Sequence, residues 1–302
     1  MKRILVIYYS QSGQLERVLD QLISPLEKDE NIEVTRYKIE VEKAYPFPWK
    51  KEDFFNVFPE SFKQIEQPIL PPSEAILTQK YDLVILGYQV WYLTPSIPVN
   101  SFLKSEYAKK LLAHTPVVTV SGSRNMWVMA QEKIKRQLKE VTSELVGNIA
   151  LVDRNINLVS VITIVDWMFT GKQRKVYGIL PKPGIAPEEI QASSRFGETI
   201  RTFLYQSNYQ GLQEELIQQN AVEVRHFLVS MDRKANRLFG IWSTLILKAK
   251  SSKRPFLLKC FNVYLFIAIW LISPLVHLIH IILYPLKHKK IQRDKTYFQG
   301  VK

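Results

Sequence analysis

The chain has 302 residues, 46% of them hydrophobic, which is enough to bury the core of one large domain and to leave a further segment. Its formal net charge of +13 is concentrated at one end: residues 1–224 carry 26 Lys+Arg against 26 Asp+Glu, and residues 225–302 carry 15 against 2. The only cysteine, Cys260, excludes an internal disulfide and a cysteine-based metal cluster, and suits a reducing compartment. The apolar N-terminus is too short for a secretory signal and lacks a cleavage motif. Composition therefore indicates a neutral body followed by a strongly basic tail.

The first predicted elements are a buried strand and an amphipathic helix. Residues 4–7 (ILVI) form an apolar run without polar alternation, which is typical of a strand covered on both faces in a parallel sheet. Apolar residues then recur at helical spacing from Leu15 to Ile23. The loop between them, residues 10–14, brings hydroxyls, free backbone N–H groups and Gly13 to the start of the helix. Such a loop suits a phosphate, although a plain helix cap uses the same residue types.

Strands and helices continue to alternate along the chain. Residues 32–39 alternate in polarity and predict a second strand near the sheet edge. Residues 44–72 are rich in aromatic residues and proline, and we interpret them as an insertion with at most one short helix that folds over the body. The remaining predicted elements are a strand at 83–86, a loop at 87–98, a helix beginning near Val99, a strand and polar loop at 116–127, a helix at 128–143, a fifth strand at 145–153 and a closing helix at 187–204.

Five strands that alternate with helices predict a doubly wound α/β fold, in which a parallel sheet has helices on both faces. In such sheets the ligand lies at the carboxyl ends of the strands, near the point where the strand order reverses. Three predicted loops meet at that edge: residues 10–15, 87–95 and 121–127. The sequence therefore places the candidate site in these three loops.

The first and second loops resemble flavin-binding loops. Residues 10–14 (SQSGQ) fit the flavodoxin phosphate loop, approximately T/S-x-T/S-G-x-T/S, whereas Leu15 lacks the last hydroxyl, a loss of about 1 kcal/mol of hydrogen bonding. Residues 87–98 (GYQVWYLTPSIP) resemble the G-x-P-x-W-x-x-x-P-P stretch of flavin-binding quinone and FMN reductases, with Gln89 where proline is usual. The resemblance implies a flavodoxin-like five-stranded parallel sheet of order 2-1-3-4-5 with FMN as the cofactor.

The same resemblance implies a set of cofactor-binding residues. The flat rings of Trp91 or Tyr92 suit stacking on the flavin, although both could simply cover the sheet edge. Asn125 and Trp127 are expected to complete the wall of the flavin or substrate site, or else to pack at the start of the next helix. The full set expected to bind FMN is Ser10, Gln11, Ser12, Gly13, Gln14, Leu15, Gln89, Val90, Trp91, Tyr92, Leu93, Ser121, Gly122, Ser123, Asn125 and Trp127.

Five phrases of the sequence give a closer match: PFPW, QVWYLTPSIP, SGSRNMW, NIALVDRNIN and VDWMFTGK. They resemble the flavodoxin-like enzymes labelled dialkylresorcinol condensing enzymes, over about residues 1–205. In the pathway to flexirubin-type pigments, a ketosynthase partner is taken to build a 2,5-dialkylcyclohexane-1,3-dione, and the flavodoxin-like partner to aromatise it. The resemblance therefore implies a flavin-dependent oxidoreductase, a dehydrogenating aromatase, with a lipid-like dialkyl dione as substrate and a ketosynthase as a pathway partner.

The side chains of this sequence suit aromatisation better than condensation. Carbon–carbon condensation normally uses a cysteine beside histidines, but Cys260 lies in the tail and His114 is the only histidine before residue 225. Aromatisation needs a hydride acceptor, which FMN supplies. We expect Arg124 to steady the substrate enolate or the reduced flavin, unless it forms only a surface salt bridge. Asp153 and Asp166 are the candidate bases, although Asp at such positions is commonly a cap or turn residue.

The basic tail contains a long apolar segment. Residues 260–286 hold no Lys, Arg, Asp or Glu, and both flanks are basic, so the segment matches an anionic membrane surface. Pro274 in its middle and cations at both ends favour a re-entrant or interfacial hairpin bent at that proline. A single span, or a buried helical pair that forms a homodimer, is left open. We expect a flavodoxin-like domain at 1–206, a basic region at 207–302, and attachment to the cytoplasmic face of the inner membrane.

Other partners and functions are weighed against this expectation. Nucleic acid is not expected as a partner because the segment between the basic flanks is apolar. No metal site is expected, since His277 and His280 have no carboxylate nearby in the sequence. Three other functions stay open: a flavodoxin-type electron carrier, a quinone reductase that uses NAD(P)H, and a flavin-free scaffold that tethers a pathway partner to the membrane. The neutral body and the apolar insertion favour a substrate cover over the acidic docking face of an electron carrier.

Overall fold

Parallel strands form the centre of the computed structural model, which describes residues 1–302. They are β1 (Lys2–Tyr8), β2 (Ile32–Lys38), β3 (Leu83–Trp91), β5 (Pro116–Ser123) and β6 (Glu144–Val152). Their order is β2-β1-β3-β5-β6, and each neighbouring pair is parallel. The remaining strand, β4 (Thr94–Pro95), is a two-residue antiparallel extension of β3, so the order is the expected 2-1-3-4-5.

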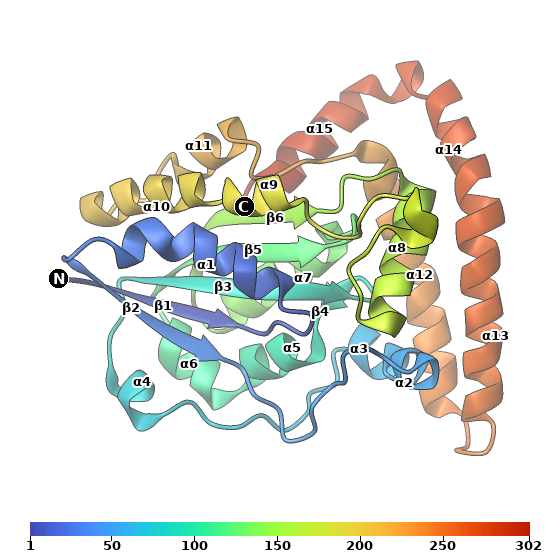
Figure 1. Cartoon of the computed structure of the whole chain (residues 1–302), viewed down its shortest axis with the longest axis horizontal. Helices are drawn as coiled ribbons and strands as arrows, with labels where there is room; N and C mark the ends of the chain where they lie inside the picture. Colours follow the sequence, from blue (N-terminus) through green and yellow to red (C-terminus); the bar gives the residue numbers. More distant parts are fainter.

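Helices cover both faces of the sheet, as Figure 1 shows. Alternate strand residues point to opposite faces, so Ile4 and Val6 pack on one side, and Leu5 and Ile7 pack on the other. The first side is covered by α1 (Gln14–Glu27), α10 (Ser194–Gln206) and α11 (Leu212–Gln218), and the second by α5 (Ile97–Lys104), α6 (Glu106–Leu112) and α7 (Val128–Glu140). The flavodoxin-like α/β fold predicted from the sequence is therefore confirmed.

Two of the expected boundaries in the body are wrong. The strand expected at 83–86 runs on to Trp91, because Gly87–Gln89 pair with β5 where a loop was expected. The closing helix expected at 187–204 is interrupted, and it forms α9 (Pro187–Gln191) and α10. At the interruption the Ser193 hydroxyl donates to the Glu189 carbonyl oxygen (3.0 Å), which offers the backbone an alternative to continuous helix.

The insertion at 44–72 is more helical than expected. It contains α2 (Lys51–Asn56) and α3 (Phe58–Phe62) in place of at most one short helix, and α4 (Glu74–Thr78) follows it. Pro59 does not prevent α3, because it stands in the first turn, where the N–H that proline lacks has no partner in any case.

An unexpected helix lies next to the insertion. α8 (Asn157–Thr170) follows β6, and the loop after it includes a 3₁₀ turn, η1 (Val176–Gly178). The Trp49 N–H donates to the Met168 carbonyl oxygen (2.8 Å), and the rings of Phe47 and Trp167 meet edge to face at 6.0 Å. The insertion and α8 therefore form one cover near the carboxyl ends of the strands (Figure 1).

The C-terminal residues form α12 (His226–Lys248), α13 (Arg254–Ile267), α14 (Ser273–Ile282), a 3₁₀ turn η3 (Pro285–Lys287) and α15 (His288–Gln299). Between α13 and α14 lies a π-helical segment, η2 (Ala268–Ile272), and the three together make one continuous helix, Arg254–Ile282. The hairpin expected at Pro274 is therefore wrong. The π-helical segment directly before Pro274 accommodates the hydrogen bond that proline cannot donate.

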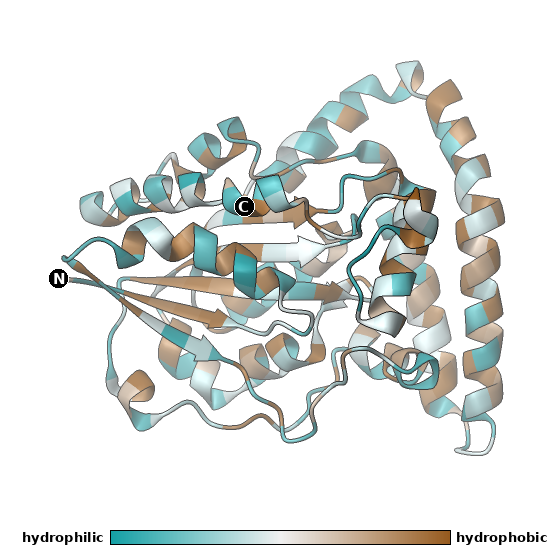
Figure 2. Ribbon diagram, viewed as in Figure 1, coloured by the Kyte–Doolittle hydropathy of each residue, from teal (hydrophilic) through white to brown (hydrophobic).

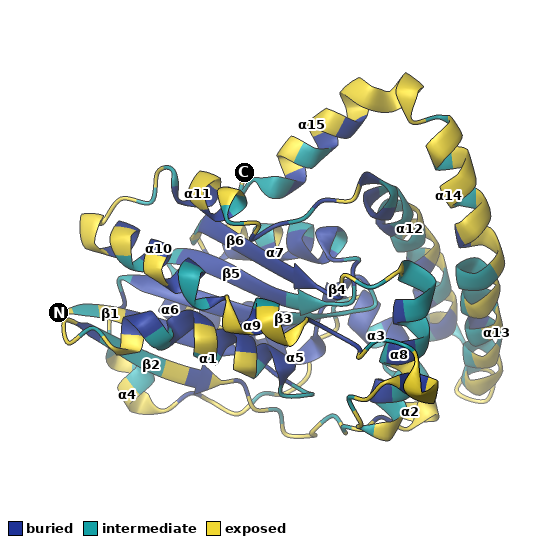
Figure 3. Ribbon diagram, turned by 45° about the horizontal axis from the view of Figure 1, so that its top comes forward, coloured by how far each residue is buried: buried dark blue, intermediate teal, exposed yellow.

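This continuous helix, which we call the apolar helix, is long and apolar enough to cross a membrane by length and composition. Figure 2 shows brown, apolar residues along it, and Figure 3 shows that much of its surface is exposed. Only 6% of an apolar 18-residue stretch of this helix is buried. After it, α15 returns to the sheet, where Gln213 Nε2 donates to the Gln299 carbonyl oxygen (2.7 Å). The segments before and after the apolar helix therefore contact the folded body, while the apolar helix between them keeps a large exposed apolar surface.

Candidate functional site

The first loop, residues 10–15, leaves backbone donors free at the start of α1. Gly13 has a positive φ of 77°, which glycine adopts without strain. The N–H groups of Ser12 and Gly13 donate no hydrogen bond within the protein. A Cβ placed on Gly13 would meet no atom within 4 Å, so the loop is open on this side. Free N–H groups at a helix N-terminus suit a phosphate.

Gln11 ties the first loop to the second loop and to the insertion. Its N–H donates to Gln89 Oε1 (3.1 Å), so Gln89 fixes the first loop from β3. The side chain of Gln11 donates through Nε2 to the Pro46 carbonyl oxygen (2.8 Å) and accepts through Oε1 from Trp49 Nε1 (3.1 Å). Two residues of the predicted set, Gln11 and Gln89, are therefore brought together.

The other side chains of the first loop serve the fold. Ser10 Oγ accepts from the Glu16 N–H (3.3 Å) in the first turn of α1. Gln14 Oε1 accepts from the Ile185 N–H (3.0 Å), and its Nε2 donates to the Ile185 carbonyl oxygen (3.3 Å), which holds the segment after α8. Leu15 is buried in the main core, so its side chain faces away from a ligand at this loop.

Trp91, at the end of β3, is met by three aromatic rings. Its ring centroid lies 6.0 Å from that of Tyr9, 5.0 Å from Tyr45 and 5.6 Å from Trp49, with interplanar angles of 82°, 81° and 74°. Tyr9 directly precedes the first loop, and Tyr45 and Trp49 belong to the insertion. Trp91 is therefore the aromatic residue of the second loop that lies beside the first loop and under the cover.

Tyr92 and Leu93 belong to a different group of contacts. Both have positive φ angles, 50° and 64°, which turn the chain from β3 into β4. The Tyr92 hydroxyl donates to the Phe54 carbonyl oxygen (2.6 Å), and burial raises the pKa of Tyr92 well above its ordinary value. Leu93 is buried in an apolar cluster with Phe58, and Val90 packs beside the sheet cores. Of the two rings expected to stack on a flavin, Trp91 is the one that contacts Tyr9 beside the first loop, and the stacking itself stays a prediction.

The third loop carries a polar network centred on Asn157, the first residue of α8. Arg124 Nη1 donates to Asn157 Oδ1 (2.8 Å) and to its carbonyl oxygen (3.1 Å), and Asn125 Nδ2 donates to the same Oδ1 (2.7 Å). Burial lowers the pKa of Arg124 to about 10, so this side chain is still cationic at neutral pH. Ser123 Oγ and Asn125 Oδ1 are buried without a hydrogen-bond partner. Ser121, at the end of β5 beside Gly122, also has a buried Oγ without a partner, so this region offers a fixed cation and three unpaired polar atoms.

The two candidate bases, Asp153 and Asp166, both form hydrogen bonds or ion pairs within the fold. Asp153 is fully buried, and its carboxylate accepts from the N–H groups of Asn155 (2.9 Å) and Gly184 (3.0 Å). Asp166 lies on α8 and pairs with Arg174 (2.9 Å), whose hydrogen bond lowers the pKa of Asp166. Both carboxylates therefore have structural partners, and a role as base stays a prediction.

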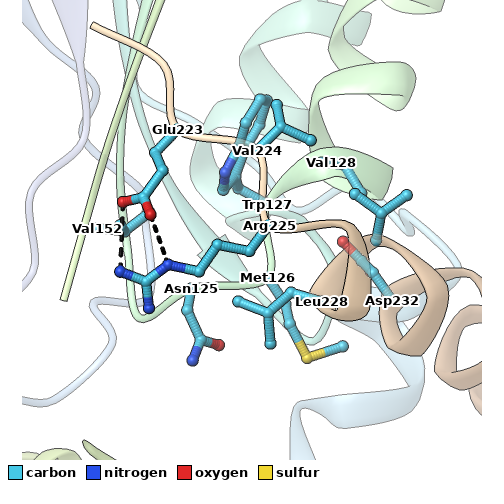
Figure 4. Close-up of a pocket in the computed structure, with 11 residues that line it drawn as sticks. Asn125, Met126, Trp127, Val128, Val152, Glu223, Val224, Arg225, Leu228 and Asp232 are labelled. Atoms are coloured by element: carbon cyan, nitrogen blue, oxygen red, sulfur yellow. Dashed lines mark hydrogen bonds and ion pairs between the residues drawn. The ribbon is translucent and has the colours of Figure 1, made fainter. Parts of the chain in front are cut away.

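A small pocket borders the far side of the third loop, where α12 begins (Figure 4). Glu223 and Arg225 form an ion pair at it (2.6 Å). Asp232 is fully buried: its Oδ2 accepts from the Met129 N–H (3.2 Å), and its Oδ1 has no partner. Trp127 packs between the main core and this pocket. The lining residues are Asn125, Met126, Trp127, Val128, Val152, Glu223, Val224, Arg225, Leu228, Val229 and Asp232.

Sequence reasoning missed three residues of the site: Asn157, Tyr45 and Trp49. The signal for Asn157 was available, because it ends the polar stretch that directly follows the fifth strand. No spacing signal marks Tyr45 or Trp49, since the insertion has no helical or strand periodicity and its contacts depend on the folded body.

A scan against models of protein families found no match, and a search of curated proteins found no similar sequence. Solved structures similar to this chain include flavoproteins and flavodoxins. A flavoprotein from Lactobacillus acidophilus, solved in complex with FMN, is 16% identical, with a TM-score of 0.38, and the match covers 50% of this chain and 93% of that one. Flavodoxin 1 from Bacillus cereus is 14% identical, with a TM-score of 0.36 and coverage of 65% and 95%. RosB, solved with the bound intermediate 8-demethyl-8-formylriboflavin-5'-phosphate, is 10% identical, with a TM-score of 0.35 and coverage of 74% and 90%. These similarities concern the architecture alone.

Proposed function

We propose that this protein is an FMN-dependent oxidoreductase that aromatises 2,5-dialkylcyclohexane-1,3-diones to dialkylresorcinols at a membrane surface. The main support for the cofactor is the pair of free N–H donors at Ser12 and Gly13, at the same sheet edge as Trp91. Ser123 Oγ and Asn125 Oδ1 are buried without partners in the third loop and would supply further hydrogen bonds to a flavin. These residues fit a group with a phosphate at one end and a flat polar ring at the other.

Arg124 is the residue to which we assign the substrate. A cyclohexane-1,3-dione enolises readily, and Asn157 holds the cationic guanidinium of Arg124 in place for a charge-assisted hydrogen bond to the enolate oxygen. When bound, FMN supplies the acceptor for the hydride that leaves the ring. The dione loses two hydrogens, one as this hydride and one as a proton released to solvent, and the product is the aromatic resorcinol.

The cover formed by the insertion and α8 suits an apolar substrate. Tyr45, Phe47 and Trp49 contribute aromatic rings from the insertion, and Trp167 and Phe169 contribute rings from α8. Such a cover would exclude water from the reacting ring and accept alkyl chains. An electron carrier needs an open edge for its flavin, so the cover favours the oxidoreductase.

The apolar helix is proposed to lie in the membrane interface. Two aromatic contacts hold it along α12: Trp242 lies 5.5 Å from Tyr264, and Phe227 lies 4.2 Å from His277. If the helix crossed the bilayer in this arrangement, it would draw the charged residues of α12 into hydrocarbon, which is costly. An interfacial helix instead buries only its exposed apolar face. A substrate with two alkyl chains dissolves in the same layer.

The proposal is tested on the full chain purified in neutral detergent and supplied with FMN. A visible flavin spectrum that shifts on binding is expected, followed by bleaching when a dialkylcyclohexane-1,3-dione is added without oxygen. Bleaching by NAD(P)H but not by the dione would indicate a reductase or a carrier. A protein that does not bind FMN would support the scaffold.

A further inference from the structure

A polar hollow lies between α12 and α15, next to the end of α14. It has no hydrophobic lining residue, in contrast to the apolar helix beside it. In Figure 1 the start of α12 lies below the junction of α14 and α15, and His226 of α12 contacts both His280 of α14 and Asp294 of α15. The lining residues are His226, Ser230, Arg233, Lys234 and Arg237 from α12 and Lys290 and Asp294 from α15. We call this hollow the cationic pocket.

The charges of the cationic pocket are mostly unpaired. Asp294, its one carboxylate, already accepts from Arg233 (3.0 Å) and lies 3.2 Å from His226 Nε2. Lys234, Arg237 and Lys290 are exposed and form no ion pair or side-chain hydrogen bond. Four Lys and Arg side chains against one carboxylate leave an excess of three positive charges around one hollow. An anion would relieve the repulsion among these cations.

A buried histidine supplies a further unsatisfied group. His226 is only 8% exposed, and its Nδ1 has no hydrogen-bond partner. Buried polar atoms are normally paired, so an orphan atom in a polar hollow indicates a missing partner. Because Nε2 faces the Asp294 carboxylate, it carries the proton of the neutral ring, so Nδ1 is an acceptor and a hydroxyl group of a bound headgroup would be its partner.

The position of the pocket indicates the source of the anion. The ring of His226 stacks on that of His280 from α14, with centroids 5.2 Å apart and an interplanar angle of 27°. On the same helix Leu275, Leu278 and Ile279 are about half exposed or more, at 55%, 56% and 46%. The pocket therefore lies beside α14, and other sides of that helix carry the apolar surface that we place in the membrane interface.

We propose that the cationic pocket binds the phosphate of an anionic phospholipid headgroup, while the acyl chains of that lipid lie along the exposed face of α14. Basic pockets beside membrane-contacting helices recognise lipid headgroups in this way. The inference rests on the membrane contact proposed above but not on the proposed reaction. The proposal predicts that the cations of this pocket bind one headgroup selectively. A general electrostatic attraction would instead involve all cations of the basic tail equally.

The test compares vesicle binding by the full chain and two variants of equal charge. K234Q/R237Q/K290Q removes the three unpaired cations of the pocket. The matched control, K287Q/K289Q/R293Q, removes three exposed cations from the same part of the tail that do not line it. Binding is measured by flotation with phosphatidylcholine vesicles, with and without phosphatidylglycerol, and with inorganic phosphate or glycerol 3-phosphate as soluble competitors.

We expect the pocket variant to lose about tenfold more affinity for phosphatidylglycerol vesicles than the control variant does. All three proteins should bind phosphatidylcholine vesicles alike, since the apolar helix is unchanged. Equal losses in the two variants would overturn the proposal in favour of diffuse attraction. Full competition by inorganic phosphate, with no preference for the lipid, would show a site for free phosphate instead. Failure of all three proteins to bind any vesicle would contradict the membrane contact itself, while leaving the flavin test unaffected.

Discussion

The rings of Phe58 and Phe261 stack with their centroids 3.8 Å apart and an interplanar angle of 5°. Phe58 begins α3 in the insertion and Phe261 lies in α13, so this pair joins the cover to the apolar helix. Both side chains are fully buried. The cover and the apolar helix are therefore parts of one packed unit, so a substitution in one should also change the stability of the other.

Replacing Phe58 with Ala should destabilise the protein by about 3–5 kcal/mol, because it leaves a cavity in this cluster. Thermal unfolding in neutral detergent measures the change. Phe58→Leu is the matched control, and it should lose much less because it keeps most of the apolar volume. An Ala variant as stable as the Leu variant would contradict the packing described here.

Replacing Arg124 with Met should slow flavin reduction by the dione about a hundredfold or more, because the enolate loses its cationic partner. FMN binding should change little, since the phosphate donors lie in the first loop. Stopped-flow absorbance without oxygen measures the rate. Arg154→Met is the control: Arg154 is nearby in sequence but pairs with Glu189 on the surface (2.7 Å). Equal rates in the two variants would remove Arg124 from the mechanism.

Asp232 should make stability fall as the pH rises from about 4 to 7. Burial raises the pKa of Asp232 from 3.8 to about 7, so folding favours the neutral carboxyl. The stabilising contribution of this group is complete below its unfolded pKa and is lost as the pH rises through its folded pKa. Asp232→Asn should therefore flatten the decline of the melting temperature over this range.

Lys133 titrates in a different pH window in the wild type, and its charge interacts with that of Asp232, so Lys133→Met is measured alongside Asp232→Asn. Burial lowers the pKa of Lys133 to about 7, so its contribution is present at high pH and is lost as the pH falls through about 7. Its window therefore lies above that of Asp232. A melting profile between pH 4 and 7 that is the same in wild type and Asp232→Asn would show that the carboxyl is not held neutral.

The exposed face of the apolar helix should dominate binding to uncharged vesicles. Leu271, Leu275 and Leu278 are 65%, 55% and 56% exposed, and each would gain roughly 1 kcal/mol or more on entering the interface. The triple change of these residues to Ser should therefore weaken flotation with phosphatidylcholine vesicles about a hundredfold or more. Ile65→Ser/Leu70→Ser changes exposed apolar residues elsewhere, and it should have no effect.

The sheet was predictable from sequence because its strands are local apolar runs such as residues 4–7. The order of the strands was expected only from the resemblance of two loops to flavin-binding loops. Helix α8 was not predicted because its apolar residues do not form a single stripe: Val165 is exposed, whereas Trp167 is buried. Pro274 illustrates the limit of a local rule. Proline usually bends a helix, but a π-helical segment before it keeps the apolar helix continuous.

The candidate site, like the fold, was predictable from the sequence only in part. The free donors of the first loop and the polar residues Ser123 and Arg124 were predictable, because the end of a parallel strand fixes where they lie. The insertion was expected to cover the body, but its contacts were not predictable, because Trp49 reaches Trp91 and Gln11 only through the fold of an aperiodic segment. Sequence alone also could not separate Trp91 from Tyr92, which are neighbours in the chain but pack in different clusters.

A single-turnover reaction tests the proposed function most directly. The full chain, loaded with FMN and freed of oxygen, is mixed with a dialkylcyclohexane-1,3-dione, and both flavin absorbance and resorcinol are measured. We predict that one resorcinol forms for each flavin reduced, at matching rates. A flavin that stays oxidised while the dione remains unchanged would contradict the aromatase.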